Sequence, residues 1–379
     1  MRRSALDLAV AELRRTPGRT VLAAGVLTVL LFLTLTLAGL ANALDRGSTG
    51  VLRSLDADLV VFNEEARLQL LRSRVPRPMM LGAIFVDGVS HVGTIGLVPT
   101  SADTPNGRVR VTLVGFSASS PAEPVRVVEG RLPRDGQPGI AAVDVVLRAQ
   151  GVELGDRLVL AGEREVEVVG FVEDTRFLQQ PTVWVPPEVW ARVRVSAFPE
   201  AGFAEQLVGA AVVRIRSTAD PDEVARAIEE EFEGTEVVTL GEAVSSIPGV
   251  DVQRATFAVL VAMSVGVLSL VVGLLFVLLV TERRPQLATL RALGAPRRLL
   301  ADTLVVQAVT LWAIALLGGA VGTQLLARVV PEAMPLELRL PVLGLVGIAS
   351  LAATLLGSLV ALRRVVGIDP ATVMSEADG

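Results

Sequence analysis

The sequence predicts an α-helical membrane protein with four transmembrane helices and one large α+β domain outside the membrane. Four stretches of 23 to 27 residues contain no charged side chain, and about 20 apolar residues suffice for a helix to cross a bilayer core of about 30 Å. Backbone groups find no water inside a bilayer, so such stretches must be helical. The mean hydropathy of +0.56 agrees with this class. The predicted spans are residues 20–44, 255–281, 303–327 and 340–362.

Charged residues divide unevenly among the segments that join these spans. Residues 45–254, between the first two spans, hold 21 arginines against 31 acidic residues. Residues 1–19, 282–298 and 363–379 instead carry clustered arginines. Positive segments next to spans stay in the cytoplasm, so both termini are predicted to be cytoplasmic and residues 45–254 to lie outside. An acidic outer domain also argues against nucleic-acid binding.

The N-terminal residues 1–19 are predicted to form an amphipathic helix at the cytoplasmic face of the membrane. Their leucines and valines recur at helical spacing beside arginines, and Pro17-Gly18 interrupts the pattern before the first span. Ala41-Asn42-Ala43 resembles a signal-peptidase site, but the apolar run before it is about twice the length that a signal peptide uses. We therefore expect an uncleaved span that anchors the outer domain.

The outer domain, residues 45–254, is predicted to be mostly β, with short β-branched runs bounded by Gly, Pro and Asp. A helical repeat over residues 220–232 lies between two such runs, which predicts a βαβ unit next to the membrane. Residues 105–200 then form an inserted β-rich lobe, and residues 328–339 form a short external loop between the last two spans. The predicted strands are 58–62, 109–114, 125–129, 157–160, 166–172, 182–185, 211–215 and 236–240.

The segment 282–298 connects the second and third spans and is the most distinctive part of the chain. Pro285 suits the first turn of a helix and Gly294 suits its end. Three leucines at three-residue spacing form an apolar stripe between them. This stripe either docks into a groove on another protein or faces lipid as a connector without a partner. The leucines are Leu287, Leu290 and Leu293.

The same segment resembles a known family. Glu282-Arg283 followed by Leu287-Ala-Thr-Leu-Arg-Ala-Leu-Gly-Ala295 is similar to the coupling helix of the MacB/FtsX-type ABC transporter permeases. The Ala288-Thr289-Leu290 variant is most like the DevC branch. The four-span layout with one large outer domain matches as well. Supporting stretches are Ala5–Arg19, Gly170-Phe-Val-Glu-Asp-Thr-Arg-Phe177, Pro181-Thr-Val-Trp184 and Ile368-Asp-Pro-Ala371, so the resemblance covers essentially the whole chain.

The resemblance implies a multi-pass permease subunit in the bacterial plasma (inner) membrane. It would pair with a second permease copy, identical or related, and dock a cytoplasmic ABC ATPase subunit. Many family members have Glu at position 286 and Gly at position 288, so Gln286 and Ala288 put the exact ATPase contacts in doubt. Pro285 does the same by interrupting the helix. The residues implied to contact the ATPase are Glu282, Arg283, Arg284, Gln286, Leu287, Leu290, Arg291, Leu293, Gly294 and Ala295.

Motion of the coupling helix would pass along the spans to the outer domain (mechanotransmission), for export or extraction of a substrate from the outer leaflet or periplasm. Membrane lipid is an expected partner, and a periplasmic adaptor is left open. The chain has no lysine, which a P-loop requires, so we expect no enzymatic activity and no cofactor here. ATP and Mg would belong to the partner ATPase. Two alternatives remain: FtsX-like signalling to a cell-wall hydrolase, and a membrane sensor or anchor without an ATPase.

Small residues at every fourth position in three spans predict close helix packing. The family resemblance puts the first set at a dimer interface, whereas packing within one chain explains each set as well. The sets are Ala258, Ala262 and Gly266; Gly318 and Gly322; and Ala353 and Gly357.

No residue pattern predicts catalysis or a metal site. The chain has no cysteine and one histidine, His91, which we expect to be structural or solvent-exposed. Alternating carboxylates are expected to share the solvated face of a strand. Three aromatic residues of the outer domain are expected in its core rather than on a binding surface. The carboxylates are Glu163, Glu165 and Glu167, and the aromatic residues are Phe177, Trp184 and Trp190.

Overall fold

The computed structural model describes residues 17–160, 164–197, 207–282, 297–329, 336 and 338–366. The chain divides into two compact units. Residues 1–43 and 254–379 form the first, here called the membrane-helix unit. Residues 44–253 form the second, here called the inter-span domain.

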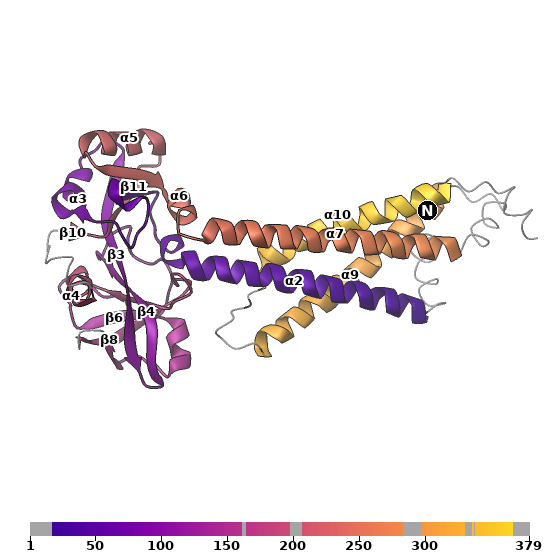
Figure 1. Cartoon of the computed structure of the whole chain (residues 1–379), viewed down its shortest axis with the longest axis horizontal. Helices are drawn as coiled ribbons and strands as arrows, with labels where there is room; N and C mark the ends of the chain where they lie inside the picture. The colour runs from indigo at the N-terminus through magenta and orange to yellow at the C-terminus, as the bar shows by residue number, and fades with distance from the viewer. Residues whose placement is uncertain are drawn as a thin grey trace, which may run out of the picture. The chain divides into compact units, whose positions relative to one another are not determined.

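Four helices are long and apolar enough to cross a membrane, which confirms the four predicted spans. They are the long coiled ribbons labelled α2, α7, α9 and α10 in Figure 1. All four extend beyond the predicted apolar stretches, and the first two do so where their ends are buried in the inter-span domain. The helices are α2 (Pro17–Arg53), α7 (Val250–Glu282), α9 (Arg297–Val329) and α10 (Leu340–Val366).

The described part of the inter-span domain is built on one ten-stranded sheet in the order β12-β1-β11-β3-β4-β9-β6-β8-β5, with β7 joining β3 and β8. A separate two-stranded sheet pairs β10 with β2. The strands are β1 (Leu59–Asn63), β2 (Val75–Pro76), β3 (Val89–Thr104), β4 (Gly107–Phe116), β5 (Val127–Gly130), β6 (Ile140–Asp144), β7 (Arg157–Leu160), β8 (Arg164–Val172), β9 (Thr182–Val185), β10 (Leu207–Val208), β11 (Ala210–Ile215) and β12 (Thr235–Thr239).

The predicted βαβ unit is confirmed as β11, the helix α5 (Pro221–Glu231) and β12. β1 lies between the two strands and runs antiparallel to both. Asp220 caps α5 with its side chain, Pro221 follows at the start, and Val224 and Ile228 are buried against the sheet. The sequence signal is strong here because the cap, the proline and the apolar repeat agree.

The second half of the sheet closes on itself. β3, β4, β9, β6, β8 and β7 pair successively, and β7 returns to β3 through Ala102 opposite Leu160. Closure removes the exposed strand edges that favour aggregation. The helix α4 (Pro187–Ala197) packs against this ring and shares its apolar cluster.

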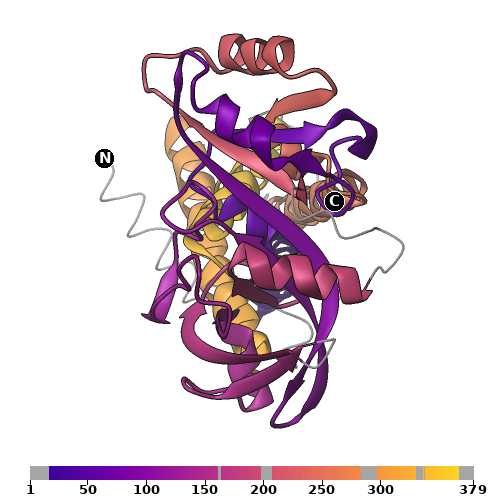
Figure 2. The same ribbon diagram turned by 90° about the vertical axis from the view of Figure 1, so that its left-hand side faces the viewer.

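The expected boundary near residue 105 does not separate two lobes, because β3 extends through both parts of the sheet. This strand has 16 residues and crosses the whole domain in Figure 2. It pairs with β11 through its first half and with β4 through its second half. No strand was predicted here because Gly93, Gly96 and Pro99 interrupt the apolar run.

Shorter helices complete the domain. They are η1 (Glu64–Ala66), α3 (Arg77–Ala83), η2 (Val145–Gln150) and α6 (Leu240–Ser245). α6 opens with a full capping box in which Thr239 and Glu242 bond each other's backbone amides. It leads through Ile247 to the start of α7.

Candidate functional site

The last turns of α2, residues 44–53, are held by a loop of the inter-span domain. This loop, residues 173–180, is named here the clamp loop. The Val51 amide donates to the Arg176 carbonyl at 3.2 Å, and the Gln179 amide donates to the Gly47 carbonyl at 2.8 Å. The Gln179 side chain donates to the Leu44 carbonyl at 2.7 Å. Helix and loop therefore join backbone to backbone.

Two glycines allow this close approach. A Cβ on Gly50 would lie 2.6 Å from the Asp174 carbonyl oxygen, and one on Gly47 would lie 2.4 Å from the Gln179 side-chain oxygen. In the clamp loop, Asp174 and Gln179 have φ of 61° and 66°, in the left-handed region that non-glycine residues rarely occupy. Such strain persists only where the surroundings hold it in place.

Ion pairs surround the same contact. The Asp174 carboxylate accepts from Arg46 on α2 at 3.2 Å and from Arg126, just before β5, also at 3.2 Å. On the helix itself, Arg53 pairs with Asp45 at 3.1 Å. Because these side chains are partly exposed, each pair stabilises the contact only modestly. The geometry of the clamp is set mainly by the backbone hydrogen bonds.

The ends of α2 and α7 meet in one buried cluster of the inter-span domain, named here the junction core. α2 contributes Val51 and Leu52, and the start of α7 contributes Val250, each at most 1% exposed. Strands β1, β4 and β9 supply large aromatic residues, including Trp184, whose ring meets that of Phe116 edge-on at 5.6 Å. Because close-packed interiors transmit strain, a displaced helix end would displace this cluster.

Two of the predicted small-residue sets pack within the membrane-helix unit. A Cβ on Gly318 would lie 2.8 Å from Thr28, and one on Gly322 would lie 3.0 Å from Phe32, both on α2. On α10, a Cβ on Gly357 would lie 2.8 Å from the Ser269 carbonyl oxygen of α7. Ala353 is 5% exposed beside it. These glycines place α9 against α2 and α10 against α7.

The third set behaves differently. Ala258, Ala262 and Gly266 on α7 are all exposed within this chain. Larger apolar neighbours on the same helix are exposed with them, among them Met263 at 62% and Leu270 at 71%. This face of α7 is therefore largely exposed within the described part of the chain.

The segment implied to contact an ATPase lies almost wholly outside the described residues. Residues 283–296 are not described, which includes Arg283, Arg284, Gln286, Leu287, Leu290, Arg291, Leu293, Gly294 and Ala295. Glu282 is the last residue of α7, and Arg297 is the first residue of α9. The amphipathic helix predicted before Pro17 lies outside the described residues as well.

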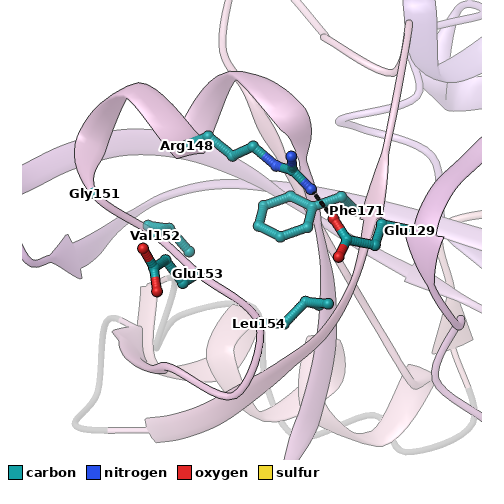
Figure 3. Close-up of a pocket in the computed structure, with 7 residues that line it drawn as sticks. All are labelled: Glu129, Arg148, Gly151, Val152, Glu153, Leu154 and Phe171. Carbon is teal, nitrogen blue, oxygen red and sulfur yellow. Dashed lines mark hydrogen bonds and ion pairs between the residues drawn. The ribbon is translucent and has the colours of Figure 1, made fainter.

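A pocket of about 440 Å³ opens beside β5, between η2 and β8. Figure 3 shows the Arg148 guanidinium over the ring of Phe171, with its Cζ 4.2 Å from the ring centre, and paired with Glu129. Glu153 and Leu154 line the opposite wall. The volume suits a small ligand, but Glu129 already neutralises the charge of Arg148.

Nothing in the described residues provides a metal centre: no group of three or more His, Cys, Asp or Glu side chains gathers there. His91 is exposed on β3. Glu165 and Glu167 are exposed on β8 and share a face as predicted, whereas Glu163 lies outside the described residues. Phe177, Trp184 and Trp190 are at most 3% exposed, which confirms their place in the core.

The residues of the clamp were not predicted as a site. Gly47 and Gly50 continue the first helix beyond its apolar stretch and give no local signal of a partner far away along the chain, between residues 174 and 179. Phe177 was predicted as a core aromatic residue and as part of the family resemblance, but not as a contact of the first span. Its isolated bridge to Thr49 of α2 depends on tertiary contacts that no residue spacing reveals.

The fold and this junction define a multi-pass membrane protein with a MacB-like core domain inserted between its first two spans. The family model of the MacB-like periplasmic core domain matches residues 20–231. That of the FtsX-like permease C-terminal domain matches residues 257–370. The chain belongs to the MacB/FtsX-type permeases of ABC transporters.

Two uncharacterized ABC transporter permeases of Mycobacterium tuberculosis are similar to nearly the whole chain. Rv2563 is 28% identical over 362 residues, which cover 93% of this chain and 95% of the relative. Rv0072 is 29% identical over 350 residues, which cover 89% of this chain and 90% of the relative.

Among solved structures, the chain is similar to the periplasmic region of MacB from Actinobacillus actinomycetemcomitans. The match has 12% identity and a TM-score of 0.39, and covers 52% of this chain and 94% of that one. The extracellular domain of the noncanonic ABC-type transporter YknZ from Gram-positive bacteria has 16% identity and a TM-score of 0.35, and covers 48% of this chain and 98% of that one.

Proposed function

We propose that this permease couples ATP hydrolysis by a separate ATPase to movement of its inter-span domain, for export or extraction of a substrate from the outer leaflet or periplasm. The observation that supports it is the junction core, where the ends of α2 and α7 pack into the same buried cluster. A force on either helix would act on the centre of the domain rather than on a loose linker. Membership of the family implies the ATPase partner and a dimer of permease subunits.

The continuity of α7 supports the coupling route. This helix has 33 residues from Val250 to Glu282, which corresponds to about 50 Å at 1.5 Å per residue. One end lies in the junction core, and the other leads directly into the segment 283–296. We propose that the leucine stripe of this segment docks into a groove of the ATPase, on the cytoplasmic side of the bacterial inner membrane. The competing explanation is that the stripe faces lipid and the segment is a connector without a partner.

The exposed face of α7 supports a dimer built on the first small-residue set. Ala258, Ala262 and Gly266 leave the helix backbone accessible along one side. Small residues let two helices approach closely in lipid, where dispersion rather than the hydrophobic effect drives association. We propose that a second permease copy, identical or related, covers this face.

The test is co-expression of the full chain with candidate ABC ATPase subunits from the same organism. Leu290→Asp and Leu293→Asp should each abolish co-purification and the stimulation of ATP hydrolysis, because a carboxylate in an apolar groove is not solvated. Val128→Asp is the matched control, since Val128 is 51% exposed on β5 of the inter-span domain. Normal coupling in both leucine variants would refute docking by this segment.

A second measurement distinguishes an ATP-driven permease from a sensor without an ATPase. Spin labels introduced in the inter-span domains of a dimer should change their separation when the ATPase binds ATP. A separation that does not respond to ATP, with the ATPase bound, would refute the proposed movement.

A further inference from the structure

Two arginines of the inter-span domain lie in one region of the fold without a carboxylate partner among the described residues. Val75, which follows the first of them, pairs with β10, and Gly209 directly after β10 lies against Gly96 of β3. Arg194 projects from α4 and is only 8% exposed. Arg74 immediately precedes β2 and is half-buried. Burial and, to a smaller extent, the nearby positive charge of Arg194 together lower the pKa of Arg74 to about 10. Burial likewise lowers the pKa of Arg194.

The fold holds these side chains in place through Trp190. Gly96 of β3 and Gly115 of β4 lie opposite each other, and together they form a flat floor beneath the indole. A Cβ on Gly96 would lie 2.5 Å from the ring, and one on Gly115 would lie 2.4 Å from the Trp190 Cβ. One helical turn later, the Arg194 guanidinium lies over the indole, with its Cζ 5.4 Å from the ring centre. Such cation–π contact orients the guanidinium without neutralising it.

The polar atoms left without partners here are donors. Arg194 Nε and Trp190 Nε1 are both buried and have no hydrogen-bond partner in the described structure. Arg74 uses Nη1 to donate to the carbonyl oxygens of Leu71 at 3.2 Å and Ser73 at 2.6 Å. Its other nitrogens make no hydrogen bond within the described residues. A buried charge without a counter-charge is costly, and so is a buried donor without an acceptor.

Arginine does not relieve this cost by losing its proton at neutral pH. A bound anion would relieve it, because it supplies both the missing negative charge and the missing acceptors. Guanidinium groups match the oxygens of phosphate in planar, paired hydrogen bonds. Two neighbouring positive charges favour a phosphate group over a carboxylate, which carries a single charge.

We propose that Arg74, Arg194 and Trp190 form a binding site for an oxyanion of the phosphate class, supplied either as free phosphate or as a phosphate ester headgroup. The site is separate from the clamp, the junction core and the pocket beside β5. It does not rest on the proposed transport function, since binding is measurable without the ATPase. The chain offers one internal competitor, because the segment 198–206 carries Glu200 and Glu205 and lies outside the described residues.

The test is isothermal titration of the full chain, purified in a maltoside detergent, with inorganic phosphate at constant ionic strength. We expect saturable binding in the unmodified chain. Arg194→Gln and Arg74→Gln should each raise the Kd about tenfold or more, because a hydrogen bond to a charged group contributes about 1.5–3 kcal/mol. Arg192→Gln and Arg72→Gln are matched controls, since both arginines are exposed. Arg192 lies two residues before Arg194, and Arg72 lies two residues before Arg74. Their Kd should not change.

Two further arms make the result decisive. Glycerophosphoglycerol presents a lipid headgroup without acyl chains. If it binds more tightly than inorganic phosphate, the ligand is a headgroup. If inorganic phosphate binds more tightly, the ligand is free phosphate. If Arg194→Gln does not fold, the exposed side of the site is still tested by Arg74→Gln. Absence of saturable binding, equal binding in Arg74→Gln, or binding that appears only in the double variant Glu200→Gln/Glu205→Gln would each overturn the proposal. The last outcome would show that the chain's own carboxylates occupy the site.

Discussion

Gly50 and Arg176 touch backbone to backbone: a methyl group on Gly50 would lie 2.8 Å from the Arg176 amide nitrogen and equally close to its carbonyl oxygen. Gly50 belongs to the last turns of α2, and Arg176 belongs to the clamp loop. The clamp loop therefore holds the last turns of α2 through direct backbone contact.

Gly50→Ala should therefore loosen the clamp. Overpacking of a close contact costs about 1–3 kcal/mol, whereas replacing an unconstrained helical glycine by alanine stabilises by about 0.5–1 kcal/mol. Gly25→Ala on the same helix is the control, because nothing lies within 4 Å of its Cβ position. Hydrogen exchange should become faster at the Val51 and Gln179 amides only in Gly50→Ala. Equal exchange in both variants would contradict the clamp.

Gly357→Leu should separate α10 from α7. A side chain there would meet the Ser269 carbonyl oxygen at 2.8 Å and the Gly273 amide nitrogen at 2.9 Å. These are backbone atoms, which cannot rotate away, so we expect a lower melting temperature in detergent. Gly344→Leu on the same helix should be tolerated, since no atom lies within 4 Å of its Cβ position. The idea fails if the two variants melt alike.

Ala262→Cys should form an intermolecular disulfide in membranes. The chain contains no cysteine, so any crosslinked dimer reports the introduced position alone. Crosslinking requires Cα atoms within about 7 Å of each other, which the exposed small-residue face of α7 would permit. Ile348→Cys is the control, because Ile348 is 72% exposed on α10. Comparable crosslinking at both positions would point to random collision rather than a specific interface.

Asp144→Asn should remove a pH dependence of stability. Asp144 is 1% exposed, and burial raises the pKa of its carboxyl group against the opposing effects of the Val146 amide, the Arg176 charge and the Thr175 hydroxyl. The folded state thus holds this proton more tightly than the unfolded state, so stability falls as pH rises from the unfolded pKa through the folded one.

At pH values above both pKa values, Asp144 is ionised in the folded state, and the folded state then bears the full free-energy cost of burying that charge. Asn keeps the cap on η2, where Asp144 accepts from the Val146 amide at 3.0 Å. We therefore expect Asp144→Asn to melt above the unmodified chain at neutral pH, with the difference shrinking as the pH is lowered. The exposed Glu188→Gln serves as control. A difference that grows toward acid pH would reverse the assigned sign.

Much of the fold could be predicted from local pattern. The four spans follow from uncharged length alone, and α5 follows from its cap, proline and apolar repeat. β7 and β9 begin and end at the predicted residues. In these elements the conformational preference of each residue favours the same secondary structure as its burial in the fold does. Strand β3 was not predicted, because its glycines are typical of interruptions in a strand. In the structure, Gly96 of this strand lies directly beneath the Trp190 ring.

The amino-acid sequence by itself determined the class of this protein, since a bilayer admits only hydrogen-bonded helices over such stretches, and the motif in residues 282–298 indicated the family. Only the tertiary structure decided where the domain contacts the end of its first helix and where two arginines lack a carboxylate partner among the described residues. Both depend on residues far apart in the chain: Gly50 on Arg176, and Arg74 on Arg194. Such contacts are created by packing, which leaves no periodic signal in the residues that make them.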